Sequence, residues 1–160
     1  MVNVIEAAKG PDTVKSIIRM MTERSLADIA ADPVIRAEFE PLYEAHRASM
    51  DIIRDHARLV GNVVFFDLSG LNMEGYNKFV PYYLFPQAVY TVSVLNASFR
   101  TKISIGSNPW APSEPTHNLA SLCERYGGGG HPRVGAISLK KGEIAEAQRI
   151  AAEVTAELNT

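Results

Sequence analysis

The first apolar pattern along the chain lies in residues 11–24. After the start signal Pro11-Asp12-Thr13, apolar side chains recur at helical spacing at Val14, Ile17, Ile18 and Met21. Positions three and four apart share one face of an α-helix. The pattern therefore predicts an amphipathic helix that runs to about Arg24.

A longer apolar stripe follows after a break at Asp32-Pro33. Its steps alternate between four and three residues, at Phe39, Tyr43, His46, Met50, Ile53, Ala57 and Val60. This spacing predicts a helix of about seven turns, with Pro41 in its first turn and a true start near Phe39. Gly61-Asn62 is expected to stop it.

The pattern becomes β-rich after residue 61. Four runs bounded by turn residues predict strands, at Asn62 to Gly70, Ala88 to Asn96, Arg100 to Ser107 and Gly135 to Lys140. Helices are expected within residues 77–87, in residues 119–126 after Asn118 as N-cap, and from Glu143 to Leu158. This order predicts an α/β fold with a mixed β-sheet of about 4–5 strands and flanking helices, preceded by an N-terminal helical arm. We expect the arm or connector to span residues 1–61 and the α/β domain residues 62–160.

Composition and charge limit the possible partners. The chain is 46% apolar and 21% charged, with a formal net charge of -2, so no global charge favours nucleic acid or an anionic membrane. The single cysteine, Cys123, excludes an intrachain disulfide and a CxxC zinc site. We find no signal peptide and no apolar window of about 18 residues. A cytoplasmic protein without a membrane partner is expected, and any anion must bind at a local site.

The stretch "YGGGGHPRVGAISL", Tyr126 to Leu139, has three interpretations. A dinucleotide-binding fingerprint opens a helix after a strand, whereas here a helix precedes the glycines and a strand follows, so that interpretation is rejected. Gly127 could cap the preceding helix, with the other glycines forming a turn. Alternatively, the four glycines form an anion-binding loop of backbone N–H groups, with His131 and Arg133 beside it. These last two alternatives stay open.

The string "GGGGHPRVGA" also resembles the Gly-Gly-Gly-His signature of the DHH-associated C-terminal domain of DHH phosphoesterases. The order of "TKISIGSN", a gap, "LASLCERY" and "GGGGH" is similar to that domain as well, and the resemblance covers about Asn62 to the C-terminus. It implies a substrate-binding domain in which the glycines and His131 contact a phosphate, beside a metal site on another domain. His131 is the candidate catalytic residue, stabilising charge on the phosphate oxygens. The candidate substrate-binding residues are Gly127, Gly128, Gly129, Gly130, His131, Arg133, Ser104 and Ser107.

Two local differences separate the chain from this pattern. The family often has an arginine in a Ser-x-Arg-Ser arrangement, where this chain has Ser104-Ile105-Gly106-Ser107. Arg100, Lys102 and Arg133 are the candidates to replace it. The missing arginine weakens the nucleotide options and leaves polyphosphate-like substrates open. "HPRVGA" also stands where the family has "HxxAAG", with a bulkier Val134 and a shifted glycine.

The larger difference is the absence of an Asp-His-His run. The nearest string, Asp55-His56-Ala57, lies in the long predicted helix on a face expected to be solvated. No cofactor is therefore assigned to this chain. The resemblance implies a manganese-dependent phosphoesterase whose manganese lies in an N-terminal DHH domain missing from this chain, which alone is expected to be inactive. The expected partners are that domain and a phosphorylated small molecule or short oligonucleotide.

Two other hypotheses remain. The chain is a non-catalytic module that binds a phosphoryl ligand and forms a homodimer through its long helix, or the glycine stretch is purely structural. An open reading frame for a DHH domain upstream would favour the phosphoesterase.

Three polar residues have competing interpretations. His46 lies on an apolar stripe, so a buried, hydrogen-bonded histidine is favoured over a ligand. Asp67, at a strand end, is a ligand group or part of a turn. His117, in the long loop of residues 107–117, is expected to be structural.

The remaining candidates are apolar or aromatic. Cys123 is expected to be an inert core thiol. Trp110 stacks on a base or pins its loop to the core, and the second is favoured. The cluster Tyr82-Tyr83-Phe85 is expected to belong to the core.

Overall fold

The structure, a computed structural model, describes residues 4, 7–8, 10–71 and 73–160. The chain divides into two compact units, residues 1–49 and residues 50–160. The boundary falls inside helix α4 (Pro33–His56). The division into an arm of residues 1–61 and a domain of residues 62–160 stays a prediction.

Unit 1, residues 1–49, is helical. It contains α2 (Pro11–Glu23), α3 (Leu26–Ala31) and the first part of α4. The apolar stripes of these helices bury Ile17, Ile29 and Ile35 in one cluster. The predicted helix ending near residue 24 is confirmed, whereas the short α3 was not predicted.

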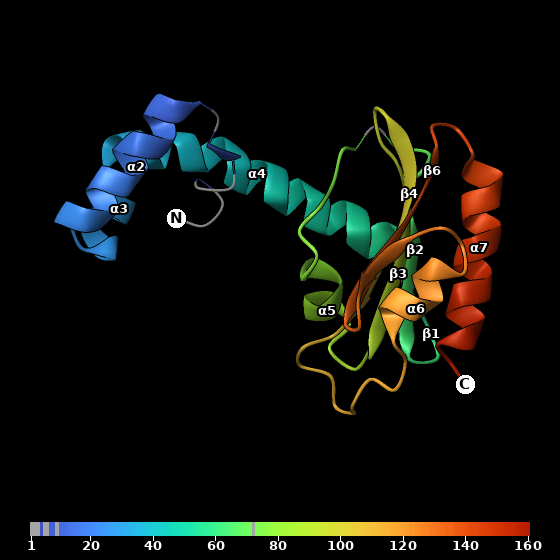
Figure 1. The fold of residues 1–160 in the computed structure, drawn as a ribbon. Helices are drawn as coiled ribbons and strands as arrows, with labels where there is room; N and C mark the ends of the chain where they lie inside the picture. The colour runs from blue at the N-terminus through green and yellow to red at the C-terminus, as the bar shows by residue number, and fades with distance from the viewer. Residues whose placement is uncertain (1–3, 5–6, 9, 72) are drawn as a thin grey trace. The chain divides into compact units, whose positions relative to one another are not determined.

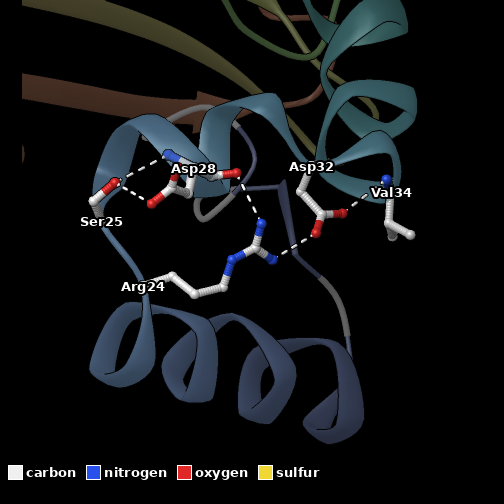
Figure 2. Close-up of polar contacts among 5 residues, drawn as sticks. All are labelled: Arg24, Ser25, Asp28, Asp32 and Val34. Atoms are coloured by element: carbon white, nitrogen blue, oxygen red, sulfur yellow. Dashed lines mark hydrogen bonds and ion pairs between the residues drawn. The ribbon is translucent and has the colours of Figure 1, made fainter.

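Polar contacts fix the two turns that connect these helices (Figure 2). Ser25 is the N-cap of α3, where its hydroxyl accepts a hydrogen bond from the Asp28 N–H at 3.2 Å and donates one to the Asp28 carboxylate at 2.6 Å. Arg24 donates to the Asp32 carboxylate at 2.6 Å and to the Asp28 carbonyl at 2.9 Å. The Asp32 pKa is lowered, first by the hydrogen bond from Arg24 and then by the Val34 N–H. Asp32 thus holds a charge at the start of α4, where a helix N-terminus stabilises an anion.

The predicted bounds of the long helix are wrong at both ends. Helix α4 begins at Pro33, whose missing N–H is tolerated in the first turn, and it continues through Pro41. It ends at His56, because Arg58–Val60 form strand β1, which pairs antiparallel with β2. Gly61 makes the turn between these strands with a φ of +59°, a conformation that favours glycine.

Unit 2, residues 50–160, is built on a six-stranded mixed sheet with flanking helices. The strands are β1, β2 (Val63–Asp67), β3 (Tyr90–Asn96), β4 (Arg100–Ser107), β5 (Gly129–His131) and β6 (Val134–Lys140), in the spatial order β1-β2-β3-β4-β6-β5. Only β2 and β3 pair in parallel among these strands. The α/β prediction and its four strands are confirmed. Two short strands, β1 and β5, were not predicted.

Helices α6 (Leu119–Glu124) and α7 (Ile144–Glu157) cover one face of the sheet (Figure 1). The main core lies there, with Val92, Val94, Ile103, Ile105 and Ile137 from the sheet. The crossover from β2 to β3 carries α5 (Val80–Leu84), which packs on a second cluster with Val64 and Phe66. None of the described helices is long and apolar enough to cross a bilayer.

Candidate functional site

The sheet face opposite α6 and α7 is polar in its centre. Alternate residues of a strand share a face, and directly paired residues of neighbouring strands lie side by side on it. Strand β4 places Lys102, Ser104 and Gly106 there. These three pair with Leu95, Ser93 and Thr91 of β3 and with Ser138, Ala136 and Val134 of β6.

Two tyrosines from the β2–β3 crossover hydrogen-bond to this face. The Tyr76 hydroxyl lies 2.6 Å from Ser93 Oγ, and the Tyr82 hydroxyl lies 3.1 Å from Thr91 Oγ1. Burial raises the pKa of both phenols from 10.0 to about 12. Both stay protonated near neutral pH, so they offer hydrogen bonds without charge.

A cavity of about 690 Å³ opens over this polar face. Its volume lies in the range of small-molecule sites, roughly 300–1,000 Å³. Its wall combines the polar face with the crossover, the loop after β4 and the β5–β6 hairpin. The wall includes Tyr76, Lys78, Phe79, Tyr82, Thr91, Lys102, Ser104, Ser107, Glu114, Gly129, Gly130 and Arg133.

Lys102 is the cation on the floor of this cavity. Burial lowers its pKa, and the positive charges of Arg100 and Lys78 lower it further. Within the described residues its ammonium has no hydrogen bond or ion pair. An ammonium that is partly desolvated and close to other cations is stabilised by an anion. The floor is therefore suited to a phosphate or carboxylate group.

Arg133 lies in the wall as part of the β5–β6 turn. Its guanidinium is 3.1 Å from the Glu114 carboxylate, which is 89% exposed. The Ser107 N–H and hydroxyl both donate to the Arg133 carbonyl, at 3.0 and 3.1 Å, and tie the turn to the end of β4. An exposed ion pair of this kind is weak and exchanges easily for another anion.

The four glycines after α6 do not form one loop, because the last two lie in a strand. Gly127 has a φ of +72° and ends the helix, with the Gly128 N–H donating to the Cys123 carbonyl at 2.9 Å. Gly129 and Gly130 continue into strand β5, which pairs with β6. The helix-cap interpretation of Gly127 is confirmed, whereas the turn expected for the other glycines is wrong for Gly129 and Gly130, which lie in β5. A loop of converging N–H groups is wrong, because β-pairing extends the backbone.

Crowding explains most of the other glycines. A Cβ on Gly128 would lie 2.3 Å from the Ala136 carbonyl, and one on Gly130 would lie 2.3 Å from the Val134 carbonyl. A Cβ on Gly135 would meet the Cys123 sulfur at 2.4 Å. Gly129 differs, because nothing lies within 4 Å of its Cβ position. Only Gly129 of the four consecutive glycines has neither a positive φ nor a close neighbour, and it lines the cavity.

His131 stands on the same sheet face as the cavity. It pairs with Val134, a residue of the wall, and its side chain is exposed on the outermost strand. It is not itself part of the wall. The cavity thus brings together five of the predicted residues, Ser104, Ser107, Gly129, Gly130 and Arg133, and leaves out Gly127, Gly128 and His131.

The position of the family arginine is occupied by another group. A Cβ on Gly106 would lie 2.7 Å from the Tyr82 hydroxyl. Arg100 is turned to Ser138, to which it donates at 3.0 Å, and is not in the wall. Of the three proposed replacements, Lys102 and Arg133 line the cavity.

Sequence reasoning missed the residues of the crossover and of β3. Lys78, Phe79 and Tyr76 belong to no motif, and their position depends on how the crossover folds over the sheet. Thr91 and Ser93 did carry a signal. They are polar at alternate positions of an otherwise apolar strand, which is typical of a strand with one polar face.

Five of the other candidates have structural or solvated positions. Asp67 accepts hydrogen bonds from the Ser69 N–H at 2.8 Å and from Gln148 at 2.6 Å, which supports the turn interpretation. His117 Nδ1 is 3.2 Å from the Tyr90 hydroxyl, as expected for a structural residue. Cys123 is buried, and burial raises its pKa to about 11, which confirms an inert thiol. The residues Asp55 and His56 are exposed, as predicted.

Three predictions about single residues are wrong. His46 is only partly buried, and its ring makes no hydrogen bond within the described part of the chain, because α4 leaves that face partly open. Trp110 is 68% exposed and does not pin its loop to the core. Buried Asn108 anchors the loop instead, through a hydrogen bond to the Ala88 carbonyl at 2.8 Å. Tyr83 is 75% exposed, so the core prediction holds for Tyr82 but not for its neighbour.

The described residues offer no metal centre. Over these ranges no group of three or more His, Cys, Asp or Glu side chains is placed to hold a metal ion. The donor set therefore does not fit a resident manganese ion, which needs several oxygen or nitrogen ligands at one point.

Comparison with known proteins relates this fold to a phosphodiesterase. No protein-family model matches the chain, and no curated protein matches it. Among solved structures, the pGpG-specific phosphodiesterase PggH from Vibrio cholerae aligns with a TM-score of 0.79 at 21% identity, over 92% of this chain and 50% of that chain. An exopolyphosphatase-related protein from Bacteroides fragilis aligns with a TM-score of 0.48 at 15% identity, over 73% of this chain and 37% of that chain.

The alignment with PggH shows a shared fold. The chain spans about half the length of that protein. The resemblance to the DHH-associated domain of phosphoesterases, predicted from the glycine–histidine stretch, is thereby confirmed at the level of the fold.

Proposed function

We propose that unit 2 is the substrate-binding domain of a DHH-type phosphodiesterase and that its cavity holds a phosphate of the substrate. The observation that carries this proposal is Lys102, an ammonium that is partly buried and has no partner among the residues that the structure describes, in the wall of a cavity that Arg133 also lines. Three cationic side chains (Lys78, Lys102 and Arg133), several hydroxyl groups and the outermost strand β5 then line one cavity. This combination is typical of an anion site.

Each group has a defined part in binding. Lys102 acts as a point charge from below, and the Ser104 hydroxyl donates beside it. Arg133 leaves the Glu114 carboxylate for the phosphate, which it meets with two parallel N–H groups. Gly129 lets the phosphate approach the β5 backbone, because no side chain stands between them.

His131 completes the site from its edge. Its exposed ring shares the sheet face of the cavity, so a phosphate that projects past β5 lies within its reach. There it donates a hydrogen bond and stabilises charge that develops on the phosphate oxygens as the P–O bond to the leaving group breaks. The described residues do not fit manganese, so we assign the metal to a separate DHH domain and no chemical step to this chain alone. We place the enzyme in the cytoplasm.

The test is binding of phosphates to the 160-residue chain. Pyrophosphate, AMP and pGpG are titrated by calorimetry into the wild type and into Lys102→Ala and Arg133→Ala. Each variant removes a charge-assisted contact, so affinity should fall about tenfold or more.

Two exposed cations outside the cavity are matched controls. Lys141→Ala and Arg125→Ala, the latter ion-paired with Glu157 and as exposed as Arg133, should bind like wild type. A wild-type chain that binds none of the phosphates contradicts the proposal, as does equal weakening by cavity and control variants.

A further inference from the structure

Two large aromatic side chains remain in water at the mouth of the cavity. Phe79 is 54% exposed and Trp110 is 68% exposed, and their ring centroids are 5.5 Å apart in an edge-to-face arrangement. Phe79 belongs to the cavity wall, as do Pro109 and Ala111 on either side of Trp110. An exposed apolar pair beside a cavity is typical of a surface that buries itself against a ligand.

The backbone holds Trp110 in this exposed position. Asn108 is 3% exposed, and its amide donates to the Ala88 carbonyl at 2.8 Å while its side-chain oxygen accepts from the Trp110 N–H at 2.9 Å. These contacts connect the loop to the start of β3. Trp110 is therefore presented by an anchored turn, and a ligand that meets it finds a preorganised surface.

The wall of the cavity combines polar and apolar side chains. Lys102, Ser104 and Arg133 form the polar part of the wall, whereas Phe79, Pro109 and Ala111 form the apolar part. A chain of phosphates has no apolar group to place against Phe79, Pro109 and Ala111. A nucleotide carries an anionic group and a flat aromatic group within one molecule, so it matches both the polar and the apolar side chains of the wall.

We propose that Phe79 and Trp110 form a stacking site for a nucleobase, so that the ligand of the cavity is a nucleotide rather than a polyphosphate. This inference rests on the proposed function, because the phosphate of the same nucleotide is the group that Lys102 and Arg133 bind. Base stacking on an aromatic ring tolerates any base, since each base has a π face. The missing arginine at Gly106 then removes one phosphate contact without removing recognition of the base.

The inference is tested by a ladder of four probes: pyrophosphate, ribose 5-phosphate, GMP and pGpG. Trp110 is the only tryptophan of the chain, so its fluorescence reports directly on stacking. GMP and pGpG should quench it at saturation, whereas pyrophosphate and ribose 5-phosphate should not. Free N-acetyltryptophanamide under the same conditions corrects for absorption by the bases.

Variants separate stacking from phosphate binding. Phe79→Ala and Trp110→Ala should each weaken GMP about tenfold in calorimetry and leave pyrophosphate unchanged. Phe79→Tyr, which keeps a ring, should restore GMP binding. Tyr83→Ala is the matched control, because Tyr83 is an exposed aromatic residue of the same crossover that does not line the cavity.

Each remaining outcome decides between the two proposals. If pyrophosphate binding depends on Lys102 and ribose 5-phosphate binds with the same affinity as GMP, the base site is overturned. The phosphate site then stands. Equal loss of GMP and pyrophosphate in the aromatic variants also overturns it. Absence of binding by all four probes overturns the proposed function and this inference with it.

Discussion

The hydroxyl of Tyr82 lies 2.7 Å from the point that a Cβ atom on Gly106 would occupy. The same hydroxyl is 3.1 Å from Thr91 Oγ1, the side chain paired with Gly106 across β3 and β4. The tyrosine ring is buried and has little room to move. Position 106 therefore requires glycine, because the Tyr82 hydroxyl occupies the space that a larger side chain would need.

A double-mutant cycle on this pair should show strong coupling. Gly106→Ala should lower the free energy of unfolding by about 1–3 kcal/mol, because the added methyl group collides with the phenol oxygen. Tyr82→Phe alone should cost about 1 kcal/mol through loss of its hydrogen bond. The double variant should be more stable than the sum predicts by at least about 0.5 kcal/mol, since the colliding oxygen is gone. Urea unfolding measures all four proteins, and additive effects would contradict the contact.

Alanine substitutions at Gly128, Gly129 and Gly130 should differ in their effect on the stability of the protein. Gly128→Ala and Gly130→Ala should each destabilise the protein by about 2 kcal/mol or more, because the new methyl group meets a backbone carbonyl of β6 that cannot move alone. Gly129→Ala, one residue from both, should change stability by less than about 0.5 kcal/mol. Its effect should appear in pyrophosphate affinity instead. Circular dichroism in urea and calorimetry give the two readouts, and similar stability losses at all three positions would refute the distinction.

The Glu114–Arg133 ion pair should compete with phosphate. Glu114→Gln removes the charge that occupies Arg133, so pyrophosphate should bind about two- to fivefold more tightly. Stability should change little, because Glu114 is almost fully exposed. Glu157→Gln, which releases Arg125 away from the cavity, is the matched control. Unchanged or weaker pyrophosphate binding by Glu114→Gln would show that Glu114 does not compete with phosphate for Arg133.

Stability should fall as the pH rises from 10 to 12. The pKa values of Tyr76 and Tyr82 are raised to about 12 in the folded state by burial, from an ordinary value of 10.0. In this window the unfolded chain loses phenolic protons that the folded chain keeps, so the unfolded state binds fewer protons and gains stability relative to the native state. Below pH 10 both states hold these protons, and the contribution is constant.

Urea unfolding at several pH values tests this slope. Tyr76→Phe should flatten the fall above pH 10, because phenylalanine has no proton to lose. Tyr83→Phe serves as the exposed control. An equally flattened slope in both variants would mean that burial of Tyr76 is not its cause.

The elements that the sequence predicted are those with a strong burial pattern. Strands β3 and β4 alternate or run apolar over seven and eight residues, so their periodicity was readable. Strands β1 and β5 have three residues each, which is too few to show the alternation of a strand, and all of β1 is exposed. The end of α4 was misplaced because Val60 continues the helical spacing of the apolar stripe but pairs with Val63 in the sheet.

The residues of the site that were predicted are mainly those of a motif. The glycine–histidine stretch led to Gly129, Gly130 and Arg133, which line the cavity. Lys78, Phe79 and Tyr82 reach the same volume from a crossover whose path depends on the parallel pairing of β2 with β3. Such pairing between distant segments leaves no local pattern in a sequence.

The side chain of Asn159 connects the C-terminal part of unit 2 to the turn between β1 and β2. The side chain of Asn159 accepts a hydrogen bond from the Asn62 N–H at 2.7 Å and donates to the Val60 carbonyl at 3.1 Å, across 97 and 99 residues of chain. The turn at Gly61 fits under this amide and is closed by it. During synthesis on the ribosome, β1 and β2 emerge long before Asn159 does, and domains fold as units once their residues are available. The turn of the first hairpin therefore gains its closing contact only once Asn159 is available, after all six strands of the sheet have been synthesised.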